Sequence, residues 1–223
     1  MSRNRRPAVL VFLCALTAAL SGCGQGGEPS AGPGAAAKPP AGPPRPEAGW
    51  DVTPAGREWK YIVVHHSAYP SGSYDSIHKE HATRKDRNGK PWEGCGYHFV
   101  IGNGKGSRDG QVEVGFRWVQ QKQGAHAGSS PEQAEYNQHG IGICLIGNFT
   151  VTEPTPAQMD ALAKLVGWLA WRNGIPRERI FGHGHIKNSD CPGRNFSFAA
   201  LFDRLDAMQI PATPQPPVVT AGR

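Results

Sequence analysis

Three short apolar segments of the chain are typical of buried strands, and they alternate with segments of helical character. The three segments are residues 61–65 (YIVVH), 97–101 (YHFVI) and 142–147 (GICLIG). Each is rich in branched or aromatic side chains and is bounded by Gly, Ser or Asn. A shorter strand is expected over residues 179–181. Strands that alternate with helices indicate an α/β fold around one sheet.

The strongest helix signal covers residues 155–176 (TPAQMDALAKLVGWLAWRNGIP). Thr155 can cap the helix, Pro156 suits its first position, and Gln158 completes a capping-box pattern. Apolar residues then recur at the spacing of one helix face, so this helix is predicted to be core scaffold. Weaker signals predict helices over residues 74–84 and 198–208, and turn-rich loops over residues 85–94 and 103–110.

The first residues of the chain have the composition of an export signal. Three arginines among the first six residues precede an apolar run over residues 7–19, which is short for a membrane span. The run ends in Leu-Ser-Gly-Cys23, which resembles a bacterial lipobox, where cleavage precedes a cysteine that receives lipid. We therefore expect a signal peptide over residues 1–22 and lipidation of Cys23. The alternative is an ordinary signal followed by a chance cysteine.

Two further segments contain too few large apolar side chains to fold. A Gly/Pro/Ala-rich linker is expected over residues 23–50 and a disordered tail over residues 211–223. The folded domain is then residues 51–210. Loss of the three arginines with the signal leaves 21 basic against 18 acidic residues, and lowers the net charge from +6 to +3. This mild excess suits an anionic partner such as a cell-wall polymer, and no Lys/Arg run suggests nucleic acid.

The cysteine count leaves one thiol to be explained. Cys95, Cys144 and Cys191 would remain after export and lipidation, and three thiols form at most one disulfide. A metal ion would account for the remaining thiol. A disulfide from Cys191 to either of the others is the alternative.

Polar residues gather in the segment FGHGHIKNSDCPG, residues 181–193. It places His183, His185, Asp190 and Cys191 within nine positions. Zinc is bound by imidazole and thiolate, and a catalytic zinc site has three protein ligands plus water. Taken alone, the segment is either part of such a site or an incidental polar loop.

Other candidates stand at the ends of the expected strands. His65 and His66 end the first strand, where successive side chains point to opposite faces, so only one can join a shared pocket. The end of a buried strand is a common place for ligands, although the chain could simply enter solvent there. Tyr97 opens the second strand. Its hydroxyl could donate to a developing oxyanion, or the ring could belong to the core.

Eight motifs occur in an order that resembles the type 2 N-acetylmuramoyl-L-alanine amidases, over roughly residues 58–205. This zinc family includes the phage lysozyme-type amidases and the peptidoglycan recognition proteins. The motifs are IVVHHS (62–67), GYHF (96–99), GAHA (124–127), YN (136–137), IGICLIG (141–147), TPAQ (155–158), GH (182–183) and CPG (191–193).

The resemblance implies a single α/β domain with a mixed central sheet flanked by helices and zinc in a surface groove. It implies zinc ligation by His65, His183 and Cys191, with Asp190 as the rival ligand. The implied reaction is hydrolysis of the amide between N-acetylmuramic acid and L-alanine of peptidoglycan or muropeptides.

The resemblance also assigns roles to three residues beyond the metal ligands. Tyr97 matches the catalytic tyrosine, and His126 matches a groove histidine expected to contact substrate. Ser189 stands at the second catalytic position, which is often Lys or Thr in the family. Its hydroxyl can donate a hydrogen bond but is a poor base at neutral pH.

The expected protein is an exported monomer anchored through the lipid on Cys23, on the periplasmic side of the cell envelope. Two alternatives are a peptidoglycan-binding lipoprotein of the same fold that does not cut, and a structural lipoprotein that tethers the envelope to the wall.

Overall fold

The computed structural model describes residues 45–52, 57–86 and 88–209. The expected signal peptide, Cys23, residues 23–44 of the expected linker and the tail over 211–223 lie outside this part. Within the described part, no helix combines the length and apolar character that crossing a bilayer requires.

A five-stranded mixed sheet forms the centre of the domain, in the order β3-β2-β4-β1-β5. Its strands are β1 (Tyr61–His66), β2 (Phe99–Ile101), β3 (Val112–Val114), β4 (Gly140–Leu145) and β5 (Ile180–Gly182). β1 pairs in parallel with β4 and β5, and β2 pairs in parallel with β4, whereas β3 is antiparallel to β2. The predicted fold class, a single α/β domain with a mixed sheet, is confirmed.

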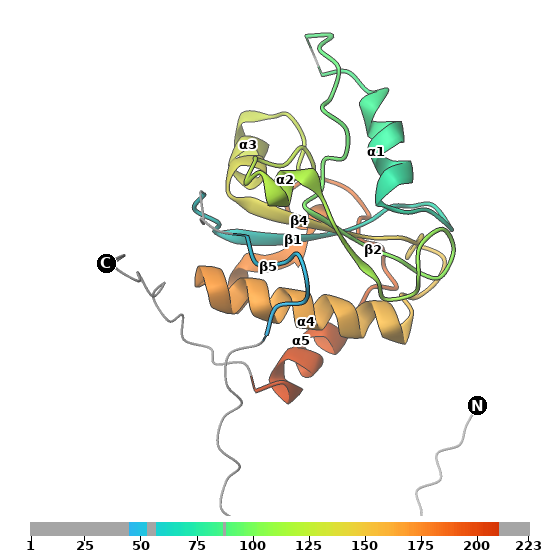
Figure 1. Cartoon of the computed structure of the whole chain (residues 1–223), viewed down its shortest axis with the longest axis vertical. Helices are drawn as coiled ribbons and strands as arrows, with labels where there is room; N and C mark the ends of the chain where they lie inside the picture. Colours follow the sequence, from blue (N-terminus) through green and yellow to red (C-terminus); the bar gives the residue numbers. More distant parts are fainter. Residues whose placement is uncertain (1–44, 53–56, 87, 210–223) are drawn as a thin grey trace, which may run out of the picture. The chain divides into compact units, whose positions relative to one another are not determined.

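Helices cover both faces of the sheet. They are α1 (Tyr74–Ala82), α2 (Phe116–Val119), α3 (Pro131–Gln138), α4 (Pro156–Asn173) and α5 (Phe198–Ala207), with short 3-10 turns η1 (Arg177–Arg179) and η2 (His183–His185). Figure 1 shows α4 and α5 on one face and α1, α2 and α3 on the other. The long helix begins at its predicted capping box on Thr155 and ends before Gly174, which is left-handed.

The alternation of side chains along β1 separates the main core from the site. Ile62 and Val64 point into the core with α4, whereas Val63 and His65 face the side of α1 and α3. The core extends to Trp50, the last residue of the expected linker. Trp50 is 1% exposed, and its carbonyl accepts a hydrogen bond from the Trp118 indole at 2.7 Å. The packed unit therefore includes Trp50.

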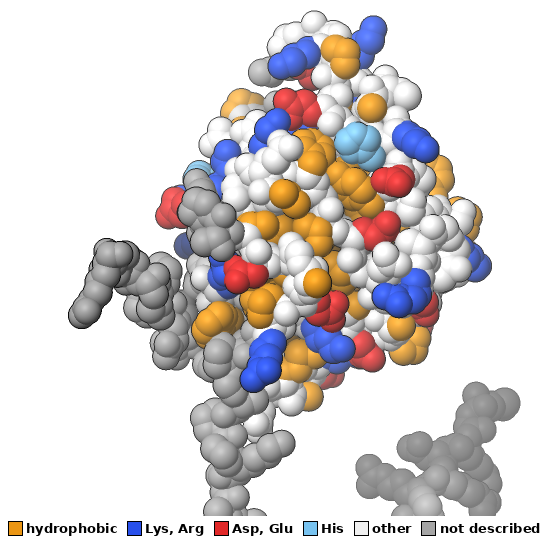
Figure 2. All heavy atoms as spheres, viewed as in Figure 1, with side chains coloured by type: hydrophobic (Ala, Val, Ile, Leu, Met, Phe, Trp, Pro, Cys, Tyr) orange, Lys and Arg blue, Asp and Glu red, His pale blue; other side chains and the backbone are white. Residues whose placement is uncertain are grey.

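Some predicted boundaries differ from the structure. β2 begins at Phe99 rather than Tyr97, and β4 lies two residues before the predicted segment 142–147. Three short elements, β3, α2 and α3, carried no clear sequence signal. On the face seen in Figure 2, basic and acidic side chains are interspersed around a central apolar area.

Candidate metal centre and its groove

His65, His183 and Cys191 meet at one edge of the sheet. His65 lies near the end of β1 and His183 directly follows β5, and these two strands are parallel neighbours that end at the same edge. Cys191 follows in the next loop. One ligand atom from each residue lies within 4.8 Å of the others, and the Cys191 Sγ is 3.8 Å from the His65 Nδ1. The three predicted ligands are therefore gathered in one group.

Backbone contacts hold the loop that carries Cys191. The Gly184 N–H donates to the Cys191 carbonyl at 2.7 Å, and the His66 N–H donates to the Cys191 Sγ at 3.4 Å. Gly193 has φ +108°, and a Cβ there would lie 2.3 Å from the Phe149 carbonyl carbon. Only glycine fits this turn, which brings the thiol back over β1.

The donor set suits a cation such as Zn²⁺. Burial lowers the pKa of His65 and His183, so both imidazoles are neutral and have a free lone pair. Burial raises the pKa of the Cys191 thiol to about 11, so a bound cation would have to release its proton. Two imidazoles and one thiolate match a zinc site with an open fourth position.

The structure separates these three residues from the other candidates. The described residues include three free thiols, so Cys191 forms no disulfide with either of the other two. They are Cys95, Cys144 and Cys191. Asp190 is exposed and outside the group. His66 points to the opposite face, where its Nδ1 accepts from the Phe149 N–H at 3.1 Å. As strand alternation predicted, only one histidine of the pair reaches the group.

The ring of Tyr97 lies beside the group. Its ring centroid is 5.0 Å from that of His65. Burial, followed by the nearby thiols of Cys144 and Cys191, raises the pKa of Tyr97 well above its ordinary value of 10. The phenol therefore keeps its proton at neutral pH.

Ser189 lies at the exposed surface of the Cys191 loop. Its Oγ accepts a hydrogen bond from the Cys191 N–H at 3.2 Å, which leaves its proton available to another acceptor. The hydroxyl therefore supports the loop in this structure.

His126 lies beneath the group rather than on an open surface. Its side chain is 7% exposed, and its Nδ1 is 3.1 Å from the His65 Nε2. Its own Nε2 is 3.2 Å from the Gly140 carbonyl oxygen. Its contacts are therefore with a candidate ligand and a strand backbone. The substrate contact expected of His126 stays a prediction.

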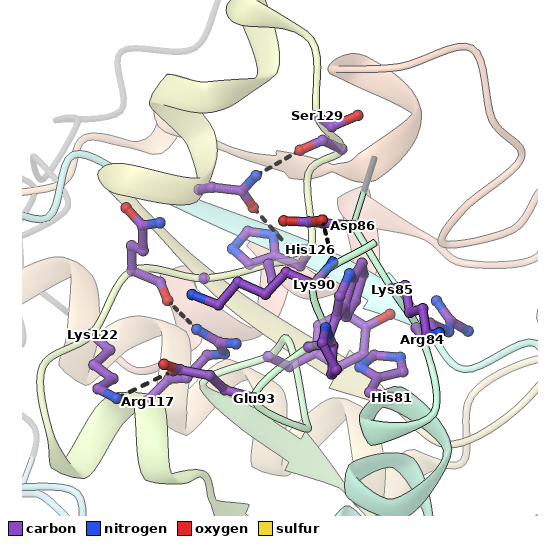
Figure 3. Close-up of a pocket in the computed structure, with 18 of the residues that line it drawn as sticks. His81, Arg84, Lys85, Asp86, Lys90, Glu93, Arg117, Lys122, His126 and Ser129 are labelled. Atoms are coloured by element: carbon purple, nitrogen blue, oxygen red, sulfur yellow. Dashed lines mark hydrogen bonds and ion pairs between the residues drawn. The ribbon is translucent and has the colours of Figure 1, made fainter. Parts of the chain in front are cut away.

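A groove of about 870 Å³ opens beside the group, and Tyr97, His126 and His183 are among the residues that line it. Figure 3 shows Lys90 and His126 near its centre, with Arg84 and Lys85 to one side and Lys122 to the other. Seven basic residues line it against two acidic ones. They are Arg57, Arg84, Lys85, Lys90, Arg117, Lys122 and Lys187, against Asp86 and Glu93.

Arg117 is the most buried of these cations. It is 5% exposed, and it donates to the carbonyls of Cys95 and Gln123, each at 2.7 Å. Lys122 pairs with Glu93 at 3.2 Å at the rim. The sequence did not point to these residues, because they come from separate segments without a local pattern.

A mixed sheet that gathers His65, His183 and Cys191 at one edge, beside a groove, is what the resemblance to the peptidoglycan amidases implied for the fold. The chain belongs to the N-acetylmuramoyl-L-alanine amidase family, whose sequence model matches residues 55–194. The resemblance inferred from the ordered motifs is confirmed.

Named relatives include both enzymes and recognition proteins. The chain is 29% identical over 154 residues to human N-acetylmuramoyl-L-alanine amidase, covering 65% of this chain and 23% of the human protein. It is 28% identical over 140 residues to peptidoglycan-recognition protein LB of Drosophila melanogaster, covering 60% of this chain and 54% of that protein. The matches thus span about half of the fly protein and about a quarter of the human one.

The solved structures with a similar fold and a comparable sequence identity include the endolysin N-acetylmuramoyl-L-alanine amidase LysCS from Clostridium intestinale URNW, with a TM-score of 0.55 and 28% identity. The match covers 68% of this chain and 86% of that one.

Proposed function

We propose that this chain is a zinc-dependent N-acetylmuramoyl-L-alanine amidase, which hydrolyses the amide between N-acetylmuramic acid and L-alanine of peptidoglycan. The observation that carries the proposal is the convergence of His65, His183 and Cys191 within 4.8 Å. The family contains proteins named as amidases and proteins named as recognition proteins, so cleavage has to be tested separately from binding.

The three metal ligands, Tyr97 and Ser189 would have different roles in amide hydrolysis. His65, His183 and Cys191 would hold the ion, which supplies a Lewis acid and a water of lowered pKa. The protonated Tyr97 hydroxyl would donate to the oxyanion that forms on the carbonyl oxygen. Ser189 would add a donor at the rim of the site.

The charge of the groove supports a peptide substrate that carries carboxylates. Seven basic residues line it against two acidic ones, and Arg117 is held by carbonyls rather than by a carboxylate. A stem peptide of peptidoglycan has free carboxylates, and a low-dielectric groove strengthens their attraction to these cations. Peptidoglycan or its muropeptides are therefore the proposed partner.

The proposed location follows from the sequence. The basic and apolar start, the Leu-Ser-Gly-Cys23 motif and the linker are consistent with an exported monomer whose lipid on Cys23 anchors it in the cell envelope. The domain would then face peptidoglycan on the periplasmic side.

Replacement of one ligand tests the proposal directly. Cys191→Ala should abolish both zinc retention and release of peptide from purified sacculi, because two imidazoles alone leave the ion without its only thiolate. Metal content by mass spectrometry and mass analysis of the products from defined muropeptides measure the two effects. Cys95→Ala is the matched control, because it removes a buried thiol outside the group.

The outcomes separate the proposal from its alternatives. Retained activity with one zinc per chain in Cys191→Ala would refute the ligand set. A wild-type protein that binds muropeptides but releases no peptide would be a recognition protein. Binding to sacculi that is insensitive to chelators, without zinc or cleavage, would indicate a structural tether.

A further inference from the structure

The two nitrogens of the His65 ring face two different partners. The Nδ1 lies 3.8 Å from the Cys191 Sγ, on the side of the candidate ion. The Nε2 lies 3.1 Å from the Nδ1 of His126. To bind the ion through Nδ1, the neutral ring of His65 must therefore carry its proton on Nε2.

The Gly140 carbonyl determines which nitrogens of the His126 and His65 rings are protonated. The Gly140 carbonyl, 3.2 Å from the Nε2 of His126, can only accept, so that nitrogen carries a hydrogen. With its ring proton on Nε2, His126 presents the lone pair of Nδ1 to the Nε2 of His65, 3.1 Å away. That lone pair accepts from the Nε2–H of His65. The lone pair on the Nδ1 of His65 is then directed at the metal group.

The surroundings of His126 fix its ring in this place. Its backbone N–H donates to the Asn137 Oδ1 at 2.8 Å, and its ring stacks on Tyr97 with centroids 6.3 Å apart. A Cβ on Gly142 of β4 would lie 2.5 Å from the His126 ring, so the strand has no side chain where the ring sits. The sheet is therefore shaped to admit an imidazole between β4 and His65.

We propose that His126 is a positioning residue for the metal centre, which holds His65 in the tautomer and orientation that binds the ion through Nδ1. The proposal rests on the proposed metal site and deepens it. Such partners orient metal-bound histidines and raise their basicity, and loss of one weakens metal affinity about 10–100-fold. This role differs from a direct contact with substrate, because His126 acts through His65.

Two substitutions of His126 separate its hydrogen bonds from its volume. His126→Leu fills the space but can neither accept from His65 nor donate to Gly140, and should weaken zinc binding about 10–100-fold in a chelator competition. His126→Gln offers an amide oxygen to His65 and an amide N–H to Gly140, and should stay within a few-fold of wild type. Equal zinc affinity of wild type and His126→Leu, or equal loss in both variants, would overturn the proposal.

His98 provides the matched control. It is buried as well, its Nδ1 accepts from the Gly142 N–H at 2.9 Å, and its Nε2 is 3.0 Å from the Lys122 carbonyl. No hydrogen bond joins it to a ligand histidine in the described part of the chain. His98→Leu should lower the melting temperature without changing zinc affinity. The His98 and His126 rings lie 5.8 Å apart, edge to face, so a matching loss of zinc affinity would mean that packing around His126, rather than its hydrogen bonds, supports the site.

A measurement on the metal-free wild-type protein completes the test without any variant. Nitrogen-15 shifts of the His65 ring should report a proton on Nε2, and a proton on Nδ1 would overturn the proposal. A wild-type protein that binds no zinc would refute the proposed function, whereas zinc binding with an indifferent His126→Leu would refute only the positioning role.

Discussion

At the scale of single residues, the Tyr97 hydroxyl is the donor whose loss should affect catalysis and leave metal binding intact. Tyr97→Phe removes the donor and keeps the ring that packs against His65 and His126. We expect kcat to fall ~10²-fold, because one oxyanion donor typically contributes about 3 kcal/mol to the transition state. Zinc affinity should be unchanged. Steady-state kinetics on a defined muropeptide and a zinc titration measure the two quantities.

The opposite pattern would contradict this role. If Tyr97→Phe loses zinc while cleavage per bound zinc is retained, the hydroxyl supports the ligands rather than the reaction. Ser189→Ala is a useful comparison, because its Oγ makes a backbone contact in an exposed loop. A larger loss of kcat in Ser189→Ala than in Tyr97→Phe would move the main donor role to the loop.

The sequence predicted the candidate ligands, but not the residues that contact them in the fold. His65, His183 and Cys191 stand in short motifs, and strand alternation shows that only one of His65 and His66 can face the site. The contact of His126 with His65 joins residues 61 positions apart, and depends on how closely the backbone of β4 approaches. No local pattern records that distance, so the sequence did not indicate this contact. The resemblance implied only a substrate contact for His126, which stays a prediction.

At the scale of elements, Gln158 couples the start of α4 to the sheet. Its Oε1 accepts from the Thr155 N–H at 3.1 Å, and its Nε2 donates to the carbonyls of Ile101 and Ile146 at 3.2 and 2.8 Å. The side chain is 1% exposed. One residue of the predicted capping box therefore also joins the ends of β2 and β4, which the sequence pattern did not indicate.

Loss of this side chain should be costly for a single substitution. Gln158→Leu leaves the Thr155 N–H and the Ile146 carbonyl without a partner, whereas the Ile101 carbonyl still accepts from the Ile146 N–H. We expect the free energy of unfolding to fall by about 2–4 kcal/mol. Urea denaturation measures it, with the exposed Gln138→Leu as the control. A change below about 1 kcal/mol in Gln158→Leu would show that these two groups find other partners.

The elements that the sequence missed are those with the weakest physical signal. β3 has three residues, and α3 has no buried residue, so neither has a clear apolar periodicity. Tyr97 and His98 continue the apolar run of β2, and the His98 N–H and carbonyl still bond to Gly142 and Gly115, although the strand itself begins at Phe99. Long periodic segments such as α4 were predictable, because their apolar residues recur at the helical spacing and so indicate which face is buried.

At the scale of the whole molecule, the domain contains several histidines that burial keeps neutral. Burial lowers the pKa of His65, His98 and His126, and lowers that of His81 to about 4. An unfolded histidine takes up a proton near pH 6.5, whereas these folded ones resist it. The unfolded state therefore binds more protons below about pH 6.5, and the metal-free domain loses stability as the pH falls towards the folded pKa values.

His81 lets this pH dependence be measured away from the metal group. Its Nδ1 accepts from the Gly96 N–H at 3.0 Å, and an asparagine oxygen can accept the same bond without titrating. Between about pH 6.5 and pH 5, a histidine with a pKa near 4 costs about 1.4 kcal/mol per pH unit. Metal-free His81→Asn should therefore lose ~2 kcal/mol less than wild type over this range. Urea titrations at both pH values measure the difference, and parallel losses in the two proteins would mean that His81 is protonated as readily in the folded domain as in the unfolded chain.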